Sequence, residues 1–215
     1  MLGDWGAHII DFAHNYLKLG LPTRIEPLRL DDYNQVIFPL SSQIRMQFPK
    51  RGAGLPACEI LWRDGSDAVP ALDQKYYNSD ASGKLVSPRL GRAGSILHRS
   101  DEQFVIHRGS HSSASRLYPR ASMMDYKQAL KAPSGGLDHM QSFIQSCMGN
   151  GKTSSPFSVG GPLTQLLMLG VIAQYLNEGF NFDRGTERIT NNPVADALLD
   201  GPKPRKGWEH YYTGV

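Results

Sequence analysis

The spacing of apolar residues changes twice along the chain, and this order constrains the fold more than any other feature of the sequence. Residues 2–17 show a helical period of about 3.6, a period of two dominates residues 23–107, and helical spacing returns near residue 122. One helix, then a run of strands, then a run of helices is typical of the α+β class. We therefore expect an open, mainly antiparallel β-sheet with helices packed on one face, formed by residues 1–215 as a single domain.

Alternating apolar and polar residues predict the strands of this sheet. The strand candidates are residues 23–30, 43–48, 58–62, 96–99 and 103–107. Pro27 weakens the first candidate, because proline has no N–H to donate to a neighbouring strand. The last two candidates flank Ser100-Asp101 and predict a hairpin. Residues 73–94 are polar and rich in Ser, Gly, Asn and Pro, and they predict a long surface loop.

Helical spacing and end signals predict four further helices. They cover residues 122–131, 137–148, 162–178 and 193–199. In the third of these, Pro162 is expected at the first helical position and Gly179 just beyond the end. Asn192 is a good N-cap for the last helix.

The first helix carries the residues that point most directly to chemistry. At about 100° per residue, Asp4, His8, Asp11 and Asn15 fall on one face, and the opposite face is apolar. Such a pattern is typical of an ordinary amphipathic helix with a solvated face. It also fits an acid/base pair in which Asp4, one turn before His8, orients the imidazole. The spacing alone leaves both interpretations open.

Three motifs resemble binding sites but lack the context that such sites need. Gly52-Ala53-Gly54-Leu55-Pro56-Ala57 matches a dinucleotide-loop spacing, yet a proline and a second strand stand where a helix is required. Residues 146–153 end like a phosphate-binding loop, but a helix precedes them, so we expect a helix end. His107 and His111 lie in strand and loop, and we expect exposed histidines there and not a zinc pair.

Composition narrows the class of protein. The chain has 215 residues, 40% of them hydrophobic, and a formal net charge of +3 with scattered basic residues, so we expect a packed core and no nucleic-acid partner. We expect no membrane partner either, because no apolar run approaches the roughly 20 residues needed to cross a bilayer. Cys58 and Cys147 have no metal-ligand spacing. A cytoplasmic location is the default expectation, because the chain begins directly with an amphipathic helix.

A series of short motifs runs along nearly the whole chain, beginning with Leu2-Gly3-Asp4-Trp5-Gly6-Ala7-His8-Ile9-Ile10-Asp11. The later motifs are Phe48-Pro49, Leu61-Trp62-Arg63-Asp64-Gly65, His139 with Phe143, Ser155-Pro156-Phe157, Gly161-Pro162-Leu163, Phe182-Asp183, Ile189-Thr190-Asn191 and Gly207-Trp208-Glu209. In this order they resemble the C-terminal half of the Gfo/Idh/MocA oxidoreductases, which are NAD(P)-dependent sugar and cyclitol dehydrogenases. The first motif is similar to the Asp-x-x-x-His helix of that family.

The resemblance implies a fold, an activity and site residues. The fold would be the family's C-terminal domain, which is like that of dihydrodipicolinate reductase, and its open sheet face would hold a homo-oligomer together. His8 would be the acid/base that exchanges a proton with a hydroxyl of a carbohydrate or cyclitol substrate, and Asp4 would orient it. The remaining substrate-binding candidates are Asp11, His139, Asn191 and Asn192.

The resemblance also implies a cofactor that this chain does not hold. In the family, an N-terminal Rossmann domain binds NAD or NADP and supplies the lysine of a Glu-Lys-Pro motif, and this sequence has neither. We therefore expect the chain to be the substrate-binding and oligomerisation half of a longer parent, with no cofactor bound by the chain alone. Two alternatives stay open: the same half of a NAD-dependent glycosidase, and a non-catalytic dimerisation domain. A leader on the missing domain would make the location periplasmic.

Overall fold

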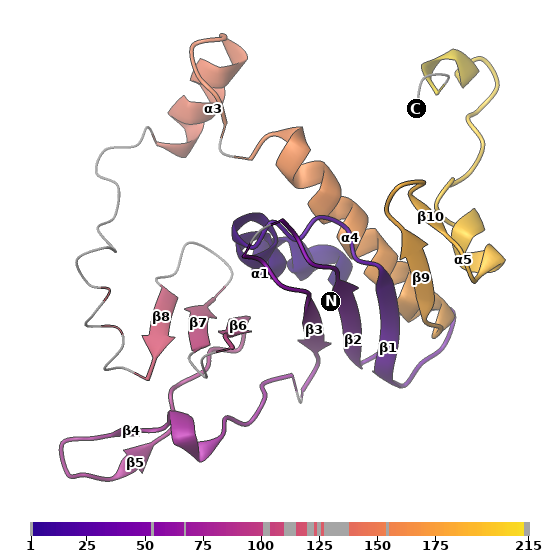
Figure 1. The fold of residues 1–215 in the computed structure, drawn as a ribbon. Helices are drawn as coiled ribbons and strands as arrows, with labels where there is room; N and C mark the ends of the chain where they lie inside the picture. The colour runs from indigo at the N-terminus through magenta and orange to yellow at the C-terminus, as the bar shows by residue number, and fades with distance from the viewer. Residues whose placement is uncertain are drawn as a thin grey trace.

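The computed structural model describes residues 2–52, 54–66, 68–100, 104–109, 115–119, 123, 126, 138–153 and 155–212. Within these residues the chain forms antiparallel sheets with helices packed against them, so the expected α+β class is confirmed (Figure 1).

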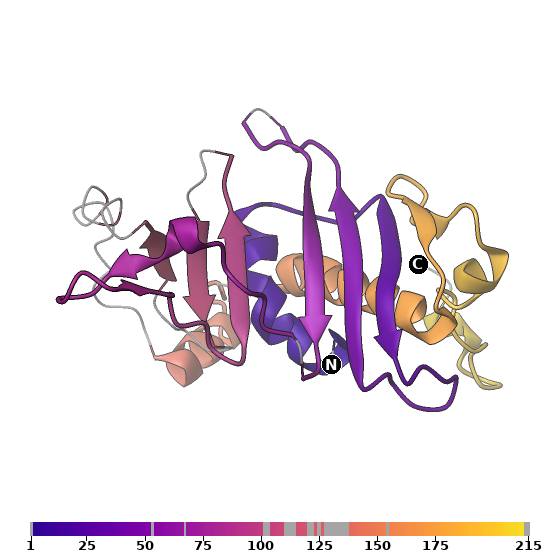
Figure 2. The ribbon, with the colours of Figure 1, turned by 90° about the horizontal axis from the view of Figure 1, so that it is seen from below.

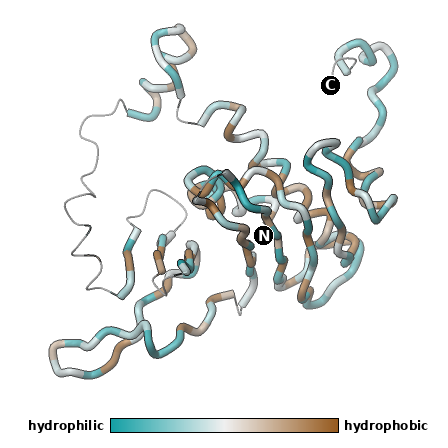
Figure 3. The backbone as a smooth tube through the Cα atoms, in the orientation of Figure 1, coloured by the Kyte–Doolittle hydropathy of each residue, from teal (hydrophilic) through white to brown (hydrophobic). Residues whose placement is uncertain are grey.

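The main sheet has five strands in the order β10-β9-β1-β2-β3, and all neighbouring strands are antiparallel. The strands are β1 Arg24–Asp31, β2 Ser41–Phe48, β3 Cys58–Asp64, β9 Phe180–Asp183 and β10 Arg188–Ile189. In β2, Ile44, Met46 and Phe48 are buried while the residues between them are only half-buried, as the alternation predicts. Figure 3 shows hydrophobic and hydrophilic segments along these strands. Pro27 lies beside a shift in the register of β1 with β2, which lets the strand continue past it.

A second sheet contains β6 Gly94–His98, β7 Phe104–Arg108 and β8 Ser115–Tyr118, in the order β6-β7-β8. The pairing of β6 with β7 confirms the predicted hairpin. The expectation that the hairpin extends a single sheet was wrong, because β6 does not pair with β3.

The prediction of a surface loop over residues 73–94 was wrong in part. It contains the 3-10 turn η1 Gln74–Tyr76 and a small hairpin of β4 Asn78–Ser79 with β5 Leu85–Val86. The Asp80 carboxylate fixes the turn of this hairpin by accepting hydrogen bonds from the backbone N–H groups of Ser82 and Lys84. The Tyr76 ring packs edge-on against Phe104 of the second sheet, with 4.4 Å between ring centroids.

The helices are α1 Leu2–Tyr16, α3 His139–Cys147, α4 Phe157–Leu176 and α5 Pro193–Ala197, followed by the 3-10 turn η2 Glu209–Tyr211. The predictions for α1, α3 and α5 are confirmed with small shifts of their ends. The Asn192 side chain caps α5 by accepting a hydrogen bond of 3.0 Å from the N–H of Ala195. The helix expected over residues 122–131 lies largely outside the described residues.

α4 differs from its prediction at both ends. It begins at Phe157, so Pro162 lies inside the helix and not at its first position. Proline has no N–H, so Pro162 cannot donate to the carbonyl of Ser158, four residues before it, and the helix lacks one internal hydrogen bond at this point. At the other end, Asn177 adopts the left-handed conformation (φ 52°) and ends the helix before Gly179.

α4 packs against β1 and β2 on one face of the main sheet, and α1 packs against α4 and against β6 of the second sheet (Figure 2). Fully buried side chains of this core include Leu2 of α1, Ile25, Ile44, Met46 and Phe180 of the sheet, and Leu166 and Leu169 of α4. Burying a side chain of this kind contributes about 1.5–3 kcal/mol, so these contacts determine where both helices lie.

α4 is apolar around its whole circumference. Within the described part of the chain it is the one helix long and apolar enough to cross a membrane, so the expectation that no such run exists was wrong. Its buried residues contact β1, β2 and α1, and a helix that is apolar on all sides is also typical of the core of a globular domain.

Glycines allow α1 and α4 to approach closely. A Cβ atom on Gly170 would lie 2.3 Å from Cδ2 of Leu2, and one on Gly6 would lie 2.6 Å from Cδ2 of Leu167. Carbon atoms in favourable contact are about 3.5–4.0 Å apart, so neither position has room for a side chain without movement of its neighbours. These two contacts fix the rotation of α1 about its own axis.

We predict that Gly170→Val lowers the free energy of unfolding by about 1–3 kcal/mol, because the added methyl groups overpack the contact with Leu2. Gly160→Val in the same helix is the control. Apart from its chain neighbours and the backbone of its own helix, no described atom lies within 4 Å of the position that its Cβ would take, so it should change the free energy by less than about 0.5 kcal/mol. Urea unfolding measures both. Equal losses at the two positions would contradict the close approach.

Candidate functional site

The apolar side of α1 is buried and its polar side faces solvent. Leu2 and Ile10 lie in the core, whereas Asp4 and His8 are exposed and Asp11 is half-buried. We call the surface formed by Asp4, His8 and Asp11 the α1 polar face. The amphipathic helix expected from the sequence is confirmed.

The α1 polar face combines carboxylates with an imidazole. Asp4 lies in the first turn, where a negative charge is favourable because the N–H groups of that turn have no helical partners. His8 follows one turn later on the same side of the helix. An imidazole can accept or donate a proton, so this surface offers an acid/base group to a molecule that binds on it.

A stripe of aromatic side chains borders the α1 polar face, and the sequence reasoning missed it. The Trp5 ring lies 5.9 Å from the His8 ring, and the Phe12 ring lies 5.1 Å from that of Tyr16. Trp5 is 44% exposed. The spacing of these aromatic residues along the helix places them on one side, and this signal was available in the sequence. Exposed rings beside polar groups suit a ligand that has both an apolar and a polar surface.

His14 lies on the buried side of α1, and its role was also missed. Its Nε2 atom is 3.1 Å from the carbonyl oxygen of Gly20, and a carbonyl only accepts, so Nε2 carries the hydrogen and donates it. Burial lowers the pKa of His14, although the bond to Gly20 and the charge of Asp11 oppose this effect. His14 therefore holds the end of α1 as a neutral imidazole.

The other predicted substrate-binding residues lie away from the α1 polar face. His139 is exposed at the start of α3, which Figures 1 and 2 place apart from α1. The side-chain oxygen of Asn191 accepts a bond of 2.6 Å from the N–H of Asn181, and Asn192 caps α5. Both asparagines thus have structural partners near β10, at the opposite edge of the main sheet from β3. A substrate contact by these three residues stays a prediction.

His107 is not the exposed histidine that we expected. It is half-buried, and its ring stacks on Phe12 with 4.8 Å between centroids and 9° between planes. Its Nδ1 atom lies 3.3 Å from the hydroxyl of Ser115. The expectation was wrong because the second sheet packs against α1. His111 lies outside the described residues.

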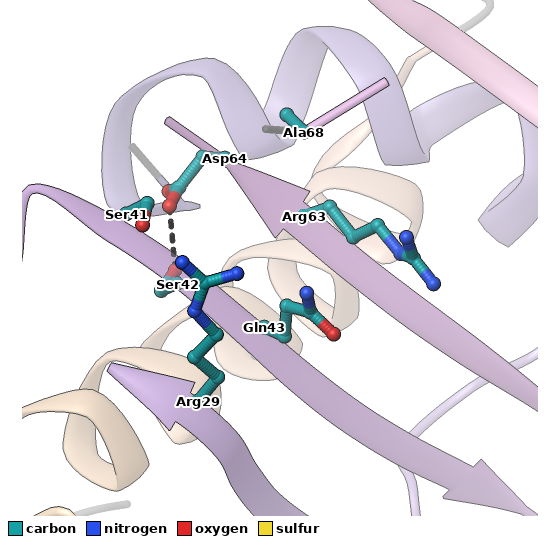
Figure 4. Close-up of a pocket in the computed structure, with 7 residues that line it drawn as sticks. All are labelled: Arg29, Ser41, Ser42, Gln43, Arg63, Asp64 and Ala68. Atoms are coloured by element: carbon teal, nitrogen blue, oxygen red, sulfur yellow. Dashed lines mark hydrogen bonds between the residues drawn. The ribbon is translucent and has the colours of Figure 1, made fainter. Parts of the chain in front are cut away.

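A buried polar network connects the main sheet to α4 beside a small pocket of about 10 Å³ (Figure 4). The Ser42 hydroxyl donates a bond of 2.6 Å to Asp64 and accepts one of 2.7 Å from the amide of the buried Gln174. The indole N–H of Trp62 donates to the other carboxylate oxygen of Asp64, at 3.0 Å. The pocket is too small for a substrate, so we assign these residues a structural role.

A groove of about 840 Å³ lies between the two sheets, next to the aromatic stripe of α1. Trp5, Ile9, Ile10 and Ala13 of α1 line it together with β3 and β6. Its volume is within the range of ligand-binding clefts. The sequence did not predict it, because the groove exists only where β6 starts a second sheet and does not extend the first.

The two glycine-rich segments that resemble nucleotide-binding loops lie in turns and not at the start of a helix. Gly52 and Gly54 lie in the turn between β2 and β3, where Arg51 bridges to Leu55, and no helix follows to present N–H groups to a phosphate. Residues 148–153 follow the end of α3, with Gly149 in the left-handed region, as expected for a helix end. Within the described ranges, no three His, Cys, Asp or Glu side chains are grouped to hold a metal.

No family model, curated protein or solved structure matches this chain. Its function is therefore inferred from its residues and their geometry.

We predict that His14 makes stability depend on pH. Because its pKa is lowered on folding from the ordinary 6.5, the unfolded state binds more protons below that pH, and stability falls as the pH drops from about 6.5 toward the folded-state pKa. His14→Gln keeps an N–H for the Gly20 carbonyl but does not titrate, so its free energy of unfolding should fall less from about pH 7.5 to pH 5. His210→Gln, at an exposed histidine, is the control and should follow the parent. If the free energy of unfolding of His14→Gln changes with pH in the same way as that of the parent, this role is contradicted.

We predict that Ser42→Ala destabilises the fold by about 2–4 kcal/mol, because it leaves both the Gln174 amide and an Asp64 oxygen without this partner. Ser146→Ala serves as the control, since that hydroxyl bonds a backbone carbonyl on its own helix, and it should cost less than about 0.5 kcal/mol. Thermal and urea unfolding check both variants. A loss for Ser42→Ala no larger than that of the control would show that the network contributes nothing.

Proposed function

We propose that this chain is the substrate-binding and oligomerisation half of a NAD(P)-dependent sugar or cyclitol oxidoreductase, with the C-terminal fold of the Gfo/Idh/MocA family. The observation that carries this proposal is the solvent exposure of Asp4 and His8 on a helix whose rotation is fixed by close contacts with α4. An acid/base pair that acts on a substrate held against a second domain has to face that domain. A pair closed inside the core would have excluded this function.

In the proposed reaction, His8 holds and moves the proton. Oxidation of a secondary alcohol removes the proton of its hydroxyl, and the reverse reaction returns it, so a neutral imidazole accepts the proton and an imidazolium gives it back. In this proposal Asp4 orients the imidazole of His8. Asp11, one turn beyond His8, accepts a hydrogen bond from a neighbouring hydroxyl. In this proposal the redox cofactor is held by a separate dinucleotide-binding domain.

The proposed association surface, the open face of the main sheet, is charged. Glu26 accepts hydrogen bonds from Arg24 (2.9 Å) and from Arg45 (3.0 Å), and Nε of Arg45 lies 3.4 Å from Glu59. The bond from Arg24 is the main cause that lowers the pKa of Glu26, and Arg45 adds to it. Oligomers formed through this face would therefore be polar at the interface and would weaken as salt is raised.

We predict that the chain binds polyols at the α1 polar face and does not bind the dinucleotide. Calorimetry with NAD and NADH should detect no binding in the micromolar range. A panel of pyranoses and cyclitols, followed by NMR, should shift the backbone signals of Asp4, His8 and Asp11. Micromolar binding of NAD, or sugar-induced shifts confined to other elements, would contradict the proposal.

We predict that His8→Ala removes proton transfer. In the protein that unites this chain with a dinucleotide-binding domain, turnover should fall about 100-fold or more, as is typical for loss of a general acid/base. Circular dichroism should be unchanged, because His8 is exposed. The matched control is His210→Ala, an exposed histidine on η2. Turnover of His8→Ala within about twofold of the parent would reject this role.

A further inference from the structure

The groove between the two sheets runs along two strand edges. Every residue from Cys58 to Gly65 and every residue from Leu90 to His98 lines it. Side chains of successive strand residues point to opposite faces, so a groove lined by consecutive residues follows the edge of the strand. Among the described strands, β3 pairs with β2 alone and β6 with β7 alone. The free edges of β3 and β6 therefore border the same groove, and α1 lies behind it (Figure 2).

These two edges have unused hydrogen-bonding capacity. A free strand edge presents a row of backbone N–H and C=O groups without partners, and an added strand can bond to them. β6 has five residues, so its edge is about 17 Å long at about 3.4 Å per residue. The Oγ atom of Ser95 on β6 is buried and has no hydrogen-bond partner among the described residues. An extended segment of five to seven residues would match this length.

The side of the groove formed by α1 is apolar, with Ile9, Ile10 and Ala13 along it. An inserted strand presents alternate side chains to α1 and to the open side. We therefore expect its occupant to be apolar at every second position.

Positive charge stands on both sides of the groove. Arg63 of β3 is half-buried and Arg92, just before β6, is exposed, and neither forms a hydrogen bond or ion pair with any residue that the structure describes. The acidic residues nearby are already engaged, because Glu59 pairs with Arg45 and Asp64 accepts bonds from the Ser42 network. Within the described part of the groove, the charge left without a partner is positive, and it complements an acidic occupant.

We propose that the groove binds an extended peptide with alternating apolar and acidic residues, which adds as a strand between β3 and β6. Its backbone bonds both edges, its apolar side chains lie on α1, and its carboxylates reach Arg63 and Arg92. This proposal does not depend on the oxidoreductase assignment.

The test uses the full chain and a synthetic peptide of seven residues that alternates glutamate with valine. We expect calorimetry to detect binding, and hydrogen exchange to show slower exchange of amides in both β3 and β6. Binding should weaken at least tenfold when lysine replaces glutamate, because the charges then repel. It should weaken similarly when alternate peptide nitrogens are methylated, because the bonds to one edge are lost.

The double variant Arg63→Glu/Arg92→Glu should lose at least tenfold in affinity for the glutamate peptide, and Arg184→Glu, an exposed arginine between β9 and β10, should not. Circular dichroism checks that the variants are folded. No binding of the glutamate peptide, equal binding of the lysine or methylated peptide, or equal affinities of the double variant and the control would each overturn the proposal. If, without peptide, the amides of β3 and β6 exchange more slowly as the protein concentration is raised, a second copy of the chain occupies the groove. That result would also overturn the proposal.

Discussion

The close contact of α1 with α4 at Gly6 and Gly170 is the constraint on which the rest of the structure depends. A side chain at either glycine would overlap a leucine of the opposite helix, so α1 packs in a single rotation about its axis. That rotation divides the helix into two sides. The apolar side enters the core and lines the groove between the sheets, and the other side carries the α1 polar face. A rotation by a single residue, about 100°, would bring Asp4 and His8 toward apolar neighbours, where unpaired charges are costly.

The sequence predicted those parts of the fold that depend on local patterns. Strands β1, β2 and β3 of the main sheet follow from alternation, and the start of α5 follows from the cap at Asn192, whereas the short strands β9 and β10 were not predicted. Features that depend on distant contacts were not predictable in this way. The period of two in β6 and β7 identifies strands but not their neighbours, and the chain therefore gave no sign that β6 starts a second sheet. The stacking of His107 on Phe12 follows from that same arrangement.

The residues of the candidate site likewise divide into those that local patterns predict and those that depend on distant contacts. The helical spacing of Asp4, His8 and Asp11 correctly placed them on a solvent-facing surface, because an amphipathic helix buries its apolar side. The aromatic stripe follows the same spacing and was detectable. The network of Ser42, Asp64 and Gln174 was not, because its members come from two strands and a helix that are distant in the sequence. The predicted ends of α4 were wrong because proline only tends to stand at a helix start and glycine only tends to stand just past a helix end. Here Asn177 adopts the left-handed conformation that was expected of Gly179.

The rotation of α1 can be measured directly by the reaction of its two histidines with diethyl pyrocarbonate, followed by mass spectrometry. His8 should react at a rate similar to that of the exposed His139 and His210, whereas the buried His14 should react at least about tenfold more slowly. If His14 reacts as fast as His8, or if His8 is the protected residue, α1 does not present Asp4 and His8 to solvent. The proposed site would then not exist.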